Sequence, residues 1–174
     1  MPDILKTIKE RRSVRRYQNR AVPAEIAEEL KEALIWAPSA ANLQARKFYF
    51  VFNPETRNQL AENTSANNKI FMSQAPLIIV ACADELKMNK FGERGKNVYL
   101  ITDIASSLEN ASLAAHERGL GSCWVGNFEE EAVRKILNLP ANLKPLLILT
   151  VGYPAETPAV KARVSVDEAV EEIK

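Results

Sequence analysis

The middle of the chain carries an uninterrupted apolar run, Leu77-Ile-Ile-Val-Ala-Cys-Ala83. A short run of this kind, bounded by polar segments, predicts a strand that is covered on both faces. Similar patterns predict strands at residues 48–52, 122–125 and 146–151. Residues 97–118 repeat small and apolar side chains at spacings of three and four, which predicts a long helix that ends at Gly119.

Further helices are predicted on both sides of this central region. Asp3 can cap a helix over residues 4–10, and Pro23 suits the first turn of a helix over residues 24–36. Shorter helical patterns lie at residues 54–62, 68–73 and 129–137. Because helices and strands alternate without a repeat or a linker, we expect one α+β domain over residues 1–174. In it, a mixed central sheet is flanked by helices.

The composition is that of an ordinary globular chain and excludes several classes of protein. The 174 residues are 47% hydrophobic and 26% charged, and no apolar run approaches the ~20 residues of a membrane span. The N-terminus has an early carboxylate and no long apolar leader, so we expect no secretory signal and a cytoplasmic location. Two cysteines and one histidine exclude a disulfide framework and a multi-histidine metal site, and we expect no metal.

The cysteines and the histidine have simple structural interpretations. Cys82 and Cys123 stand in apolar stretches, which predicts two buried, reduced thiols. His116 precedes Gly119 in the last turn of the predicted long helix. We expect its imidazole to meet the helix carbonyls there rather than to act as a general base.

The positive charges gather near the N-terminus. The net charge is only +1, yet residues 1–20 hold seven Lys and Arg against two acidic side chains. A local cationic patch on a nearly neutral protein favours one anionic ligand over a long polyanion. Tyr17 is the only aromatic residue among these arginines, which disfavours a nucleic-acid-binding module.

Two basic motifs can be assigned to such a ligand. In Arg11-Arg-Ser-Val-Arg-Arg-Tyr17, the first and fifth residues share a face on either a helix or a strand. In Lys161-Ala-Arg163, an extended chain places both cations on one side, where they can hold a phosphate. Each motif by itself favours a simpler interpretation: a solvated basic surface for both, or a processing-type signal for the first.

Two polar segments suit a flat heterocycle. Pro38-Ser-Ala-Ala-Asn-Leu-Gln44 combines small side chains with two amides that can pair with a heterocycle edge, or it is an ordinary polar loop. In Gly119-Leu-Gly-Ser-Cys-Trp-Val-Gly126, the last glycine leaves its backbone N–H open to close approach, unless the segment is simply a helix cap and a turn. The chain has neither a P-loop nor a dinucleotide-binding GxGxxG motif.

These motifs, in this order, resemble the nitroreductase family of FMN-dependent oxidoreductases. Asn68 ahead of Ala75-Pro76 completes the pattern, and the resemblance runs from about Lys6 to about Ala169. It implies a layered α+β homodimer with two FMN molecules at the subunit interface. It also implies that flavin N5 carries the chemistry, with no catalytic acid or base side chain.

The resemblance implies a role for each motif. Arg11, Arg12, Ser13 and Arg15 hold the FMN phosphate, the ribityl chain and the N1/O2 edge, with Lys161 and Arg163 completing the phosphate site. Pro38, Ser39, Ala40 and Asn42 come from the other subunit. Asn68 pairs with the pyrimidine edge, and the backbone of Trp124, Val125 and Gly126 faces N5 and O4. Arg15 and Gly126 tune the flavin.

The implied activity is an FMN-dependent NAD(P)H oxidoreductase that reduces nitroaromatic compounds or quinones in a ping-pong cycle. NADH or NADPH is then a transient substrate, and a small molecule is the electron acceptor. The alternatives are other flavin chemistry, such as dehydrogenation or dehalogenation, and a non-enzymatic flavin-binding protein. Two departures from the family stand out. Ala45-Arg46 replaces the usual Pro-Trp, and the short chain predicts an open active site.

Overall fold

The computed structural model describes residues 3–174, and a four-stranded sheet lies at its centre. The strands are β1 (Arg46–Val51), β2 (Leu77–Asp84), β3 (Gly121–Val125) and β4 (Leu143–Gly152), in the order β1-β2-β4-β3. The α+β class is therefore confirmed. The sheet itself is antiparallel at every strand pair rather than mixed, and the parallel pairing recorded in residues 3–174 is an isolated bridge between Ser13 and Ser122.

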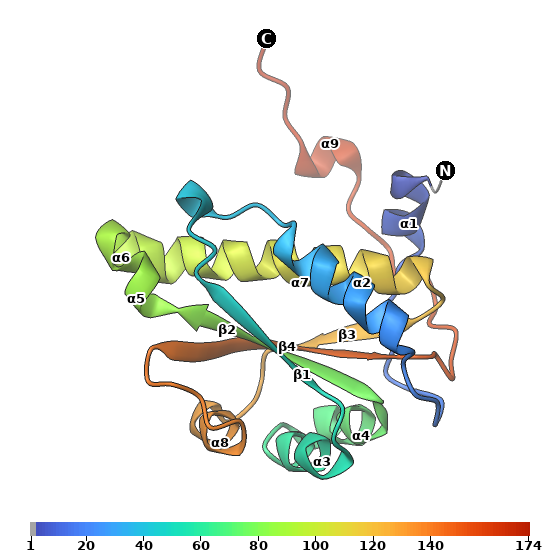
Figure 1. Ribbon diagram of the computed structural model, residues 1–174. Coiled ribbons are helices and arrows are strands. Elements are labelled where there is room, and N and C mark those ends of the chain that lie inside the picture. The colour runs from blue at the N-terminus through green and yellow to red at the C-terminus, as the bar shows by residue number, and fades with distance from the viewer. Residues whose placement is uncertain (1–2) are drawn as a thin grey trace.

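Helices cover both faces of this sheet (Figure 1). On one face lie α2 (Ala24–Ile35) and α7 (Leu100–Glu117). On the other lie α3 (Pro54–Glu62), α4 (Ala66–Gln74) and α8 (Glu130–Ile136). Residues of β2 enter two separate cores in alternation, with Ile79 facing the α7 side and Ile78 the α3–α4 side. The apolar run at residues 77–83 therefore indicates that helices cover both faces of β2. Such coverage does not require that the neighbouring strands run parallel to β2.

Shorter elements complete the chain. Asp3 caps α1 (Ile4–Glu10) by accepting from the backbone N–H groups of Leu5 and Lys6, as predicted. The long helix starts later than predicted, because a π-helical turn, η3 (Gly95–Tyr99), precedes α7. The remaining short helices are η1 (Ala40–Asn42), α5 (Glu85–Met88), η2 (Asn89–Phe91), α6 (Gly92–Arg94) and α9 (Val166–Ala169).

The segment after α1 is bound to the ends of β3 and β4. The backbone N–H of Val14 donates to the Ser122 carbonyl at 2.9 Å, and that of Gln18 donates to the Tyr153 carbonyl at 2.9 Å. The buried Tyr17 hydroxyl lies 2.7 Å from the Val14 carbonyl and 2.8 Å from the Thr150 hydroxyl. These bonds place the first basic motif at the same end of the sheet as the exit of β4.

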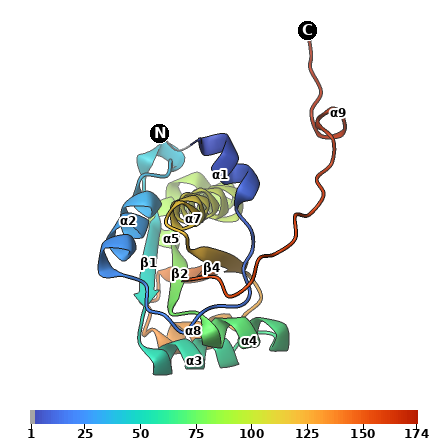
Figure 2. The ribbon, with the colours of Figure 1, turned by 90° about the vertical axis from the view of Figure 1, so that its right-hand side faces the viewer.

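The C-terminal residues leave the body of the molecule as an arm (Figures 1 and 2). Residues 159–174 are exposed, and they include apolar side chains such as Val160, which is 77% exposed, and Ile173, which is 94% exposed. Among the helices of residues 3–174, none combines the length and the apolar character that a membrane crossing requires.

Both cysteines are buried and free, as predicted. Burial raises the pKa of the Cys82 thiol to about 12, and burial likewise raises the pKa of Cys123. The thiolate is the reactive form, and at about pH 8 roughly one Cys82 in ten thousand carries it.

We therefore expect neither thiol to react with a disulfide reagent such as Ellman's reagent in the native protein at about pH 8. Both should react within minutes once the chain is unfolded, which spectrophotometric titration with and without denaturant will show. Rapid reaction of one thiol per native chain would contradict the burial of that residue.

Candidate functional site

A cationic cavity unites the two basic motifs. It has a volume of about 450 Å³ and is walled on one side by the N-terminal motif and on the other by the start of the arm. Five cationic side chains line it together with a single carboxylate, that of Glu156. The cationic residues are Arg11, Arg12, Arg15, Lys161 and Arg163, and Ser13 lies among them.

The backbone conformation of the first motif is set by its neighbours. Val14 is buried, whereas Ser13 and Arg15 remain exposed on either side of it, as an extended chain requires. The backbone N–H of Arg15 donates to the Glu156 carboxylate at 2.6 Å, and the Arg16 carbonyl accepts from the N–H of Ala155 at 2.8 Å. The exit of β4 thus holds the arginines at the mouth of the cavity.

The arginines of this cavity are only partly occupied by partners within the chain. Nε of Arg11 lies 3.1 Å from Oε1 of Glu109 on α7, and the guanidinium of Arg12 donates to the carbonyls of Lys9 and Arg11. Arg163 donates to the carbonyls of Lys161 and Ala162. Several N–H donors therefore remain for an oxyanion, and an anion relieves the repulsion between like charges.

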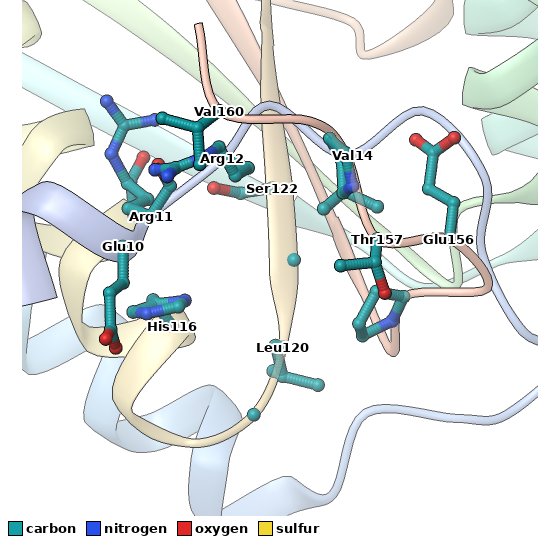
Figure 3. Close-up of a pocket in the computed structure, with 15 residues that line it drawn as sticks. Glu10, Arg11, Arg12, Val14, His116, Leu120, Ser122, Glu156, Thr157 and Val160 are labelled. Atoms are coloured by element: carbon teal, nitrogen blue, oxygen red, sulfur yellow. The ribbon is translucent and has the colours of Figure 1, made fainter.

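A second cavity of about 390 Å³ adjoins the cationic one (Figure 3). Its wall is largely apolar, with Val14, Leu120 and Val160, and it shares Arg11, Arg12 and Glu156 with its neighbour. His116 and Glu10 line the opposite side (Figure 3).

His116 lies in the last turn of α7, as predicted, but its imidazole lines the cavity wall. Among residues 3–174, the ring makes no hydrogen bond to a helix carbonyl. The reason is local, because backbone N–H groups of Arg118, Gly119 and Leu120 already donate to the carbonyls of the last turn. The N-terminal segment packs beside β3 and creates the cavity that the imidazole faces. Sequence periodicity does not predict this contact between distant segments.

The loop 38–44 lies elsewhere in the chain. Its Ala40 N–H donates to the carboxylate of Asp103, near the start of α7, whereas His116 at the cavity is near the end of α7. Thirteen residues of helix separate these points by about 20 Å. Pro38, Ser39, Ala40 and Asn42 are not among the described residues that line the cationic cavity of their own chain.

This loop has an unusual backbone. Ala41, Asn42 and Gln44 have positive φ angles of 50°, 53° and 49°, in the left-handed region. That conformation costs an ordinary L-residue about 1–2 kcal/mol, and asparagine less. Its persistence in three residues without glycine shows that contacts outside the loop hold it.

The last set of site residues lies together at the end of β3. The Asn68 amide donates to the Asn127 carbonyl at 3.4 Å, which joins α4 to the segment after β3. The indole of Trp124 turns inward and donates to the Ser112 hydroxyl at 3.1 Å, while Val125 is buried. A Cβ on Gly126 would meet only Leu147, at an ordinary 3.6 Å, so packing within the chain does not require a glycine there.

Gly121, in contrast, is required by packing. An added Cβ would lie 2.5 Å from Cγ2 and 2.7 Å from Cβ of Val14, whose β-branched side chain cannot rotate clear. We expect Gly121→Ala to lower the free energy of unfolding by about 1–3 kcal/mol, through displacement of the segment that carries the arginines. Denaturant titration measures this change.

The matched control is Gly126→Ala, which should change the unfolding free energy by less than about 0.5 kcal/mol. If the two variants are equally stable, the close approach of Gly121 to Val14 does not hold the segment in place.

Comparison with known proteins places this arrangement in a family. The model of the nitroreductase family matches residues 8–70 and 62–153 of this chain. A relative from Methanothermobacter thermautotrophicus, named for NADH dehydrogenase and NAD(P)H nitroreductase activities, is 31% identical over 163 residues. These cover 91% of this chain and 81% of the relative. An iodotyrosine deiodinase from Haliscomenobacter hydrossis is 29% identical over 170 residues, covering 84% of this chain and 77% of that protein.

Solved structures share the fold. An FMN-dependent nitroreductase from Clostridium difficile is 25% identical, with a TM-score of 0.84, and the match covers 98% of this chain and 99% of that one. The NADPH:FMN oxidoreductase of Vibrio harveyi, solved with NAD⁺, is also 25% identical, with a TM-score of 0.88 and coverage of 98% and 77%. The chain belongs to the nitroreductase family and is an oxidoreductase.

Proposed function

We propose that this protein binds FMN and passes hydride from NADH or NADPH to a nitroaromatic compound or a quinone. The observation that carries the proposal is the cationic cavity, in which Lys161 and Arg163 meet the N-terminal basic motif from the opposite end of the chain. A terminal phosphate with about two negative charges suits several guanidinium donors at one place. The cavity therefore fits the phosphate of FMN, with Arg11, Arg12 and Ser13 as further ligands.

The end of β3 suits the ring of the flavin. Asn68 offers an amide for the pyrimidine edge, and it already lies beside the segment that follows β3. Gly126 presents a backbone N–H without a covering side chain, which suits contact with N5, and the backbone of Trp124 and Val125 continues this edge. The residues present thus fit both ends of the cofactor.

Bound FMN supplies the hydride chemistry, and the protein supplies position and charge. Arg15 is assigned to the N1/O2 edge, where its fixed positive charge favours the reduced, anionic flavin over the oxidised one. No acid or base side chain is needed for hydride transfer. The absence of a dinucleotide-binding GxGxxG motif agrees with a nicotinamide that visits the pocket and leaves again before the acceptor enters.

A homodimer completes the site. No residue of loop 38–44 lines the cationic cavity of its own chain in the described residues, and about 20 Å of α7 separates Asp103, which holds the loop, from His116 in the adjoining cavity. A second copy brings its loop, with Pro38, Ser39, Ala40 and Asn42, to the flavin. Exposed apolar side chains support this assembly, since Trp36 is 76% exposed and the arm beyond residue 158 carries several exposed valines.

A second candidate is reductive dehalogenation on the same scaffold. The similarity to the iodotyrosine deiodinase favours it. The excursion between β2 and α7, residues 85–99, is short, and only brief helical turns lie within it. A short excursion leaves little chain to enclose a halogenated phenol, so reduction of quinones and nitro compounds remains the leading candidate.

Anaerobic mixing with NADH or NADPH tests the function directly. The purified protein should show the absorption of bound flavin, either nucleotide should bleach it, and a quinone or nitroaromatic added afterwards should restore the colour. Restoration by a halogenated phenol alone would favour the second candidate. Bound flavin that neither nucleotide reduces would overturn the proposed role of NADH or NADPH as electron donor.

The role of Arg15 has its own test. Arg15→Gln keeps hydrogen bonding but removes the charge, so the flavin midpoint potential should fall by tens of millivolts. This follows from roughly 20 mV for each kcal/mol lost in a two-electron couple. FMN should stay bound through Lys161 and Arg163. Loss of the flavin with an unchanged potential in the remaining holoprotein would make Arg15 a phosphate ligand instead.

A further inference from the structure

The strained loop 38–44 is held by the buried Asp103 and the half-buried Arg46, two polar side chains that the flavin site itself does not use. Arg46 begins β1, directly after the loop, and Asp103 lies in the first turn of α7. Asp103 is only 5% exposed, and both of its carboxylate oxygens accept from the Ala40 N–H, at 3.0 and 3.1 Å. The carboxylate is therefore bound to the backbone immediately ahead of the left-handed residues.

The guanidinium of Arg46 binds the entry of the loop and the first turn of α7. It donates to the carbonyls of Pro38 at 3.0 Å and Ala37 at 2.5 Å, where α2 leads into the loop. It also donates to the carbonyls of Ile35 at 3.3 Å and of Asp103 at 3.1 Å. One planar group thus joins the end of α2, the start of the loop and the first turn of α7.

The pKa shifts of Arg46 and Asp103 show that the two side chains act as an oppositely charged pair. Burial lowers the pKa of the Arg46 guanidinium, and Asp103 opposes that shift. Burial raises the pKa of Asp103, and the Ala40 N–H and Arg46 oppose it. Each group therefore compensates part of the desolvation of the other, and both remain available to hold backbone.

We propose that Arg46 and Asp103 are positioning residues, which hold loop 38–44 in its left-handed conformation so that Ser39 and Asn42 can bind the flavin of the partner subunit. The inference rests on the proposed function in its final step. It also assigns a role to Ala45-Arg46, which replaces the usual Pro-Trp of the family. The planar guanidinium of Arg46 holds the loop by hydrogen bonds, where a bulky side chain can hold a loop by packing.

The main test replaces the fork. Arg46→Ala should speed amide hydrogen exchange at Ala40, Asn42 and Gln44 in the flavin-free protein, and it should weaken FMN binding about ten- to a hundredfold. Arg46→Lys, with three donors at one point, and Asp103→Asn, with one acceptor oxygen in place of two, should give smaller changes in the same direction. Exchange is followed by mass spectrometry and binding by the quenching of flavin fluorescence.

A matched control is Arg134→Ala. The guanidinium of Arg134 also donates to three backbone carbonyls, those of Leu143, Pro140 and Ala141, but it joins α8 to β4 on the other face of the sheet. This variant should lose a comparable set of bonds without faster exchange in residues 38–44 and without weaker FMN binding.

A rescue separates loop positioning from general stability. Glycine adopts positive φ without steric cost, so Ala41→Gly added to Arg46→Ala should restore part of the FMN affinity without restoring the lost hydrogen bonds. If Arg46→Ala leaves the loop amides protected, or frees them while FMN affinity stays unchanged, the inference is wrong. If the unmodified protein fails to bind FMN, the proposed function fails, and the exchange experiment still decides whether Arg46 and Asp103 hold the loop.

Discussion

The buried hydroxyl of Tyr17 is the contact on which the rest of the site depends. It bonds to the Val14 carbonyl and to Thr150 in β4, and the Thr150 hydroxyl in turn lies 3.2 Å from the Cys123 carbonyl in β3. Leaving one of these buried groups unpaired would cost about 1–3 kcal/mol. The network therefore fixes the N-terminal segment against β3 and β4. It thereby also fixes where the arginines of this segment lie relative to the sheet.

Once that segment is fixed, the electrostatics follow. The backbone bonds of residues 14–18 hold the N-terminal arginines at the exit of β4, where Lys161 and Arg163 join them in one cavity. Glu156 neutralises part of this charge while it accepts from the Arg15 N–H. The Glu156 carboxylate thus reduces the repulsion between the cationic side chains and also holds the backbone of Arg15. A bound phosphate would neutralise the remaining positive charge.

The helix α7 sets the geometry of the proposed dimer. Its start holds the strained loop through Asp103, and its end forms the wall of the cavity through Ser112 and His116. The loop and the cationic cavity are thus formed at different places along α7. In the proposed dimer, the loop of a second copy would complete the site, and the active site would be shared between the subunits.

Hydrophobic periodicity and helix-capping or helix-ending residues predicted most of the helices and strands from the local sequence. The bounds of α1 and α3 match the predicted residues 4–10 and 54–62, because Asp3, Asn53 and Pro54 mark their starts within the sequence itself. The two basic motifs were visible for the same reason. Their meeting in one cavity was implied by the family resemblance rather than by local residues, since it depends on pairing between segments at opposite ends of the chain.

The antiparallel pairing, the cavity beside His116 and the left-handed loop were decided by tertiary structure. An apolar run records how well a strand is covered, but hydrogen bonds with distant strands choose its direction. Alanine and glutamine do not favour positive φ, so the sequence could not predict this conformation at Ala41 and Gln44. In the proposed role, Arg46 and Asp103 impose it from outside the loop. The sequence by itself determined the helices, the strands and the chemical character of each motif. Only the tertiary structure decided which motifs share a site, because contacts between distant segments bring them together.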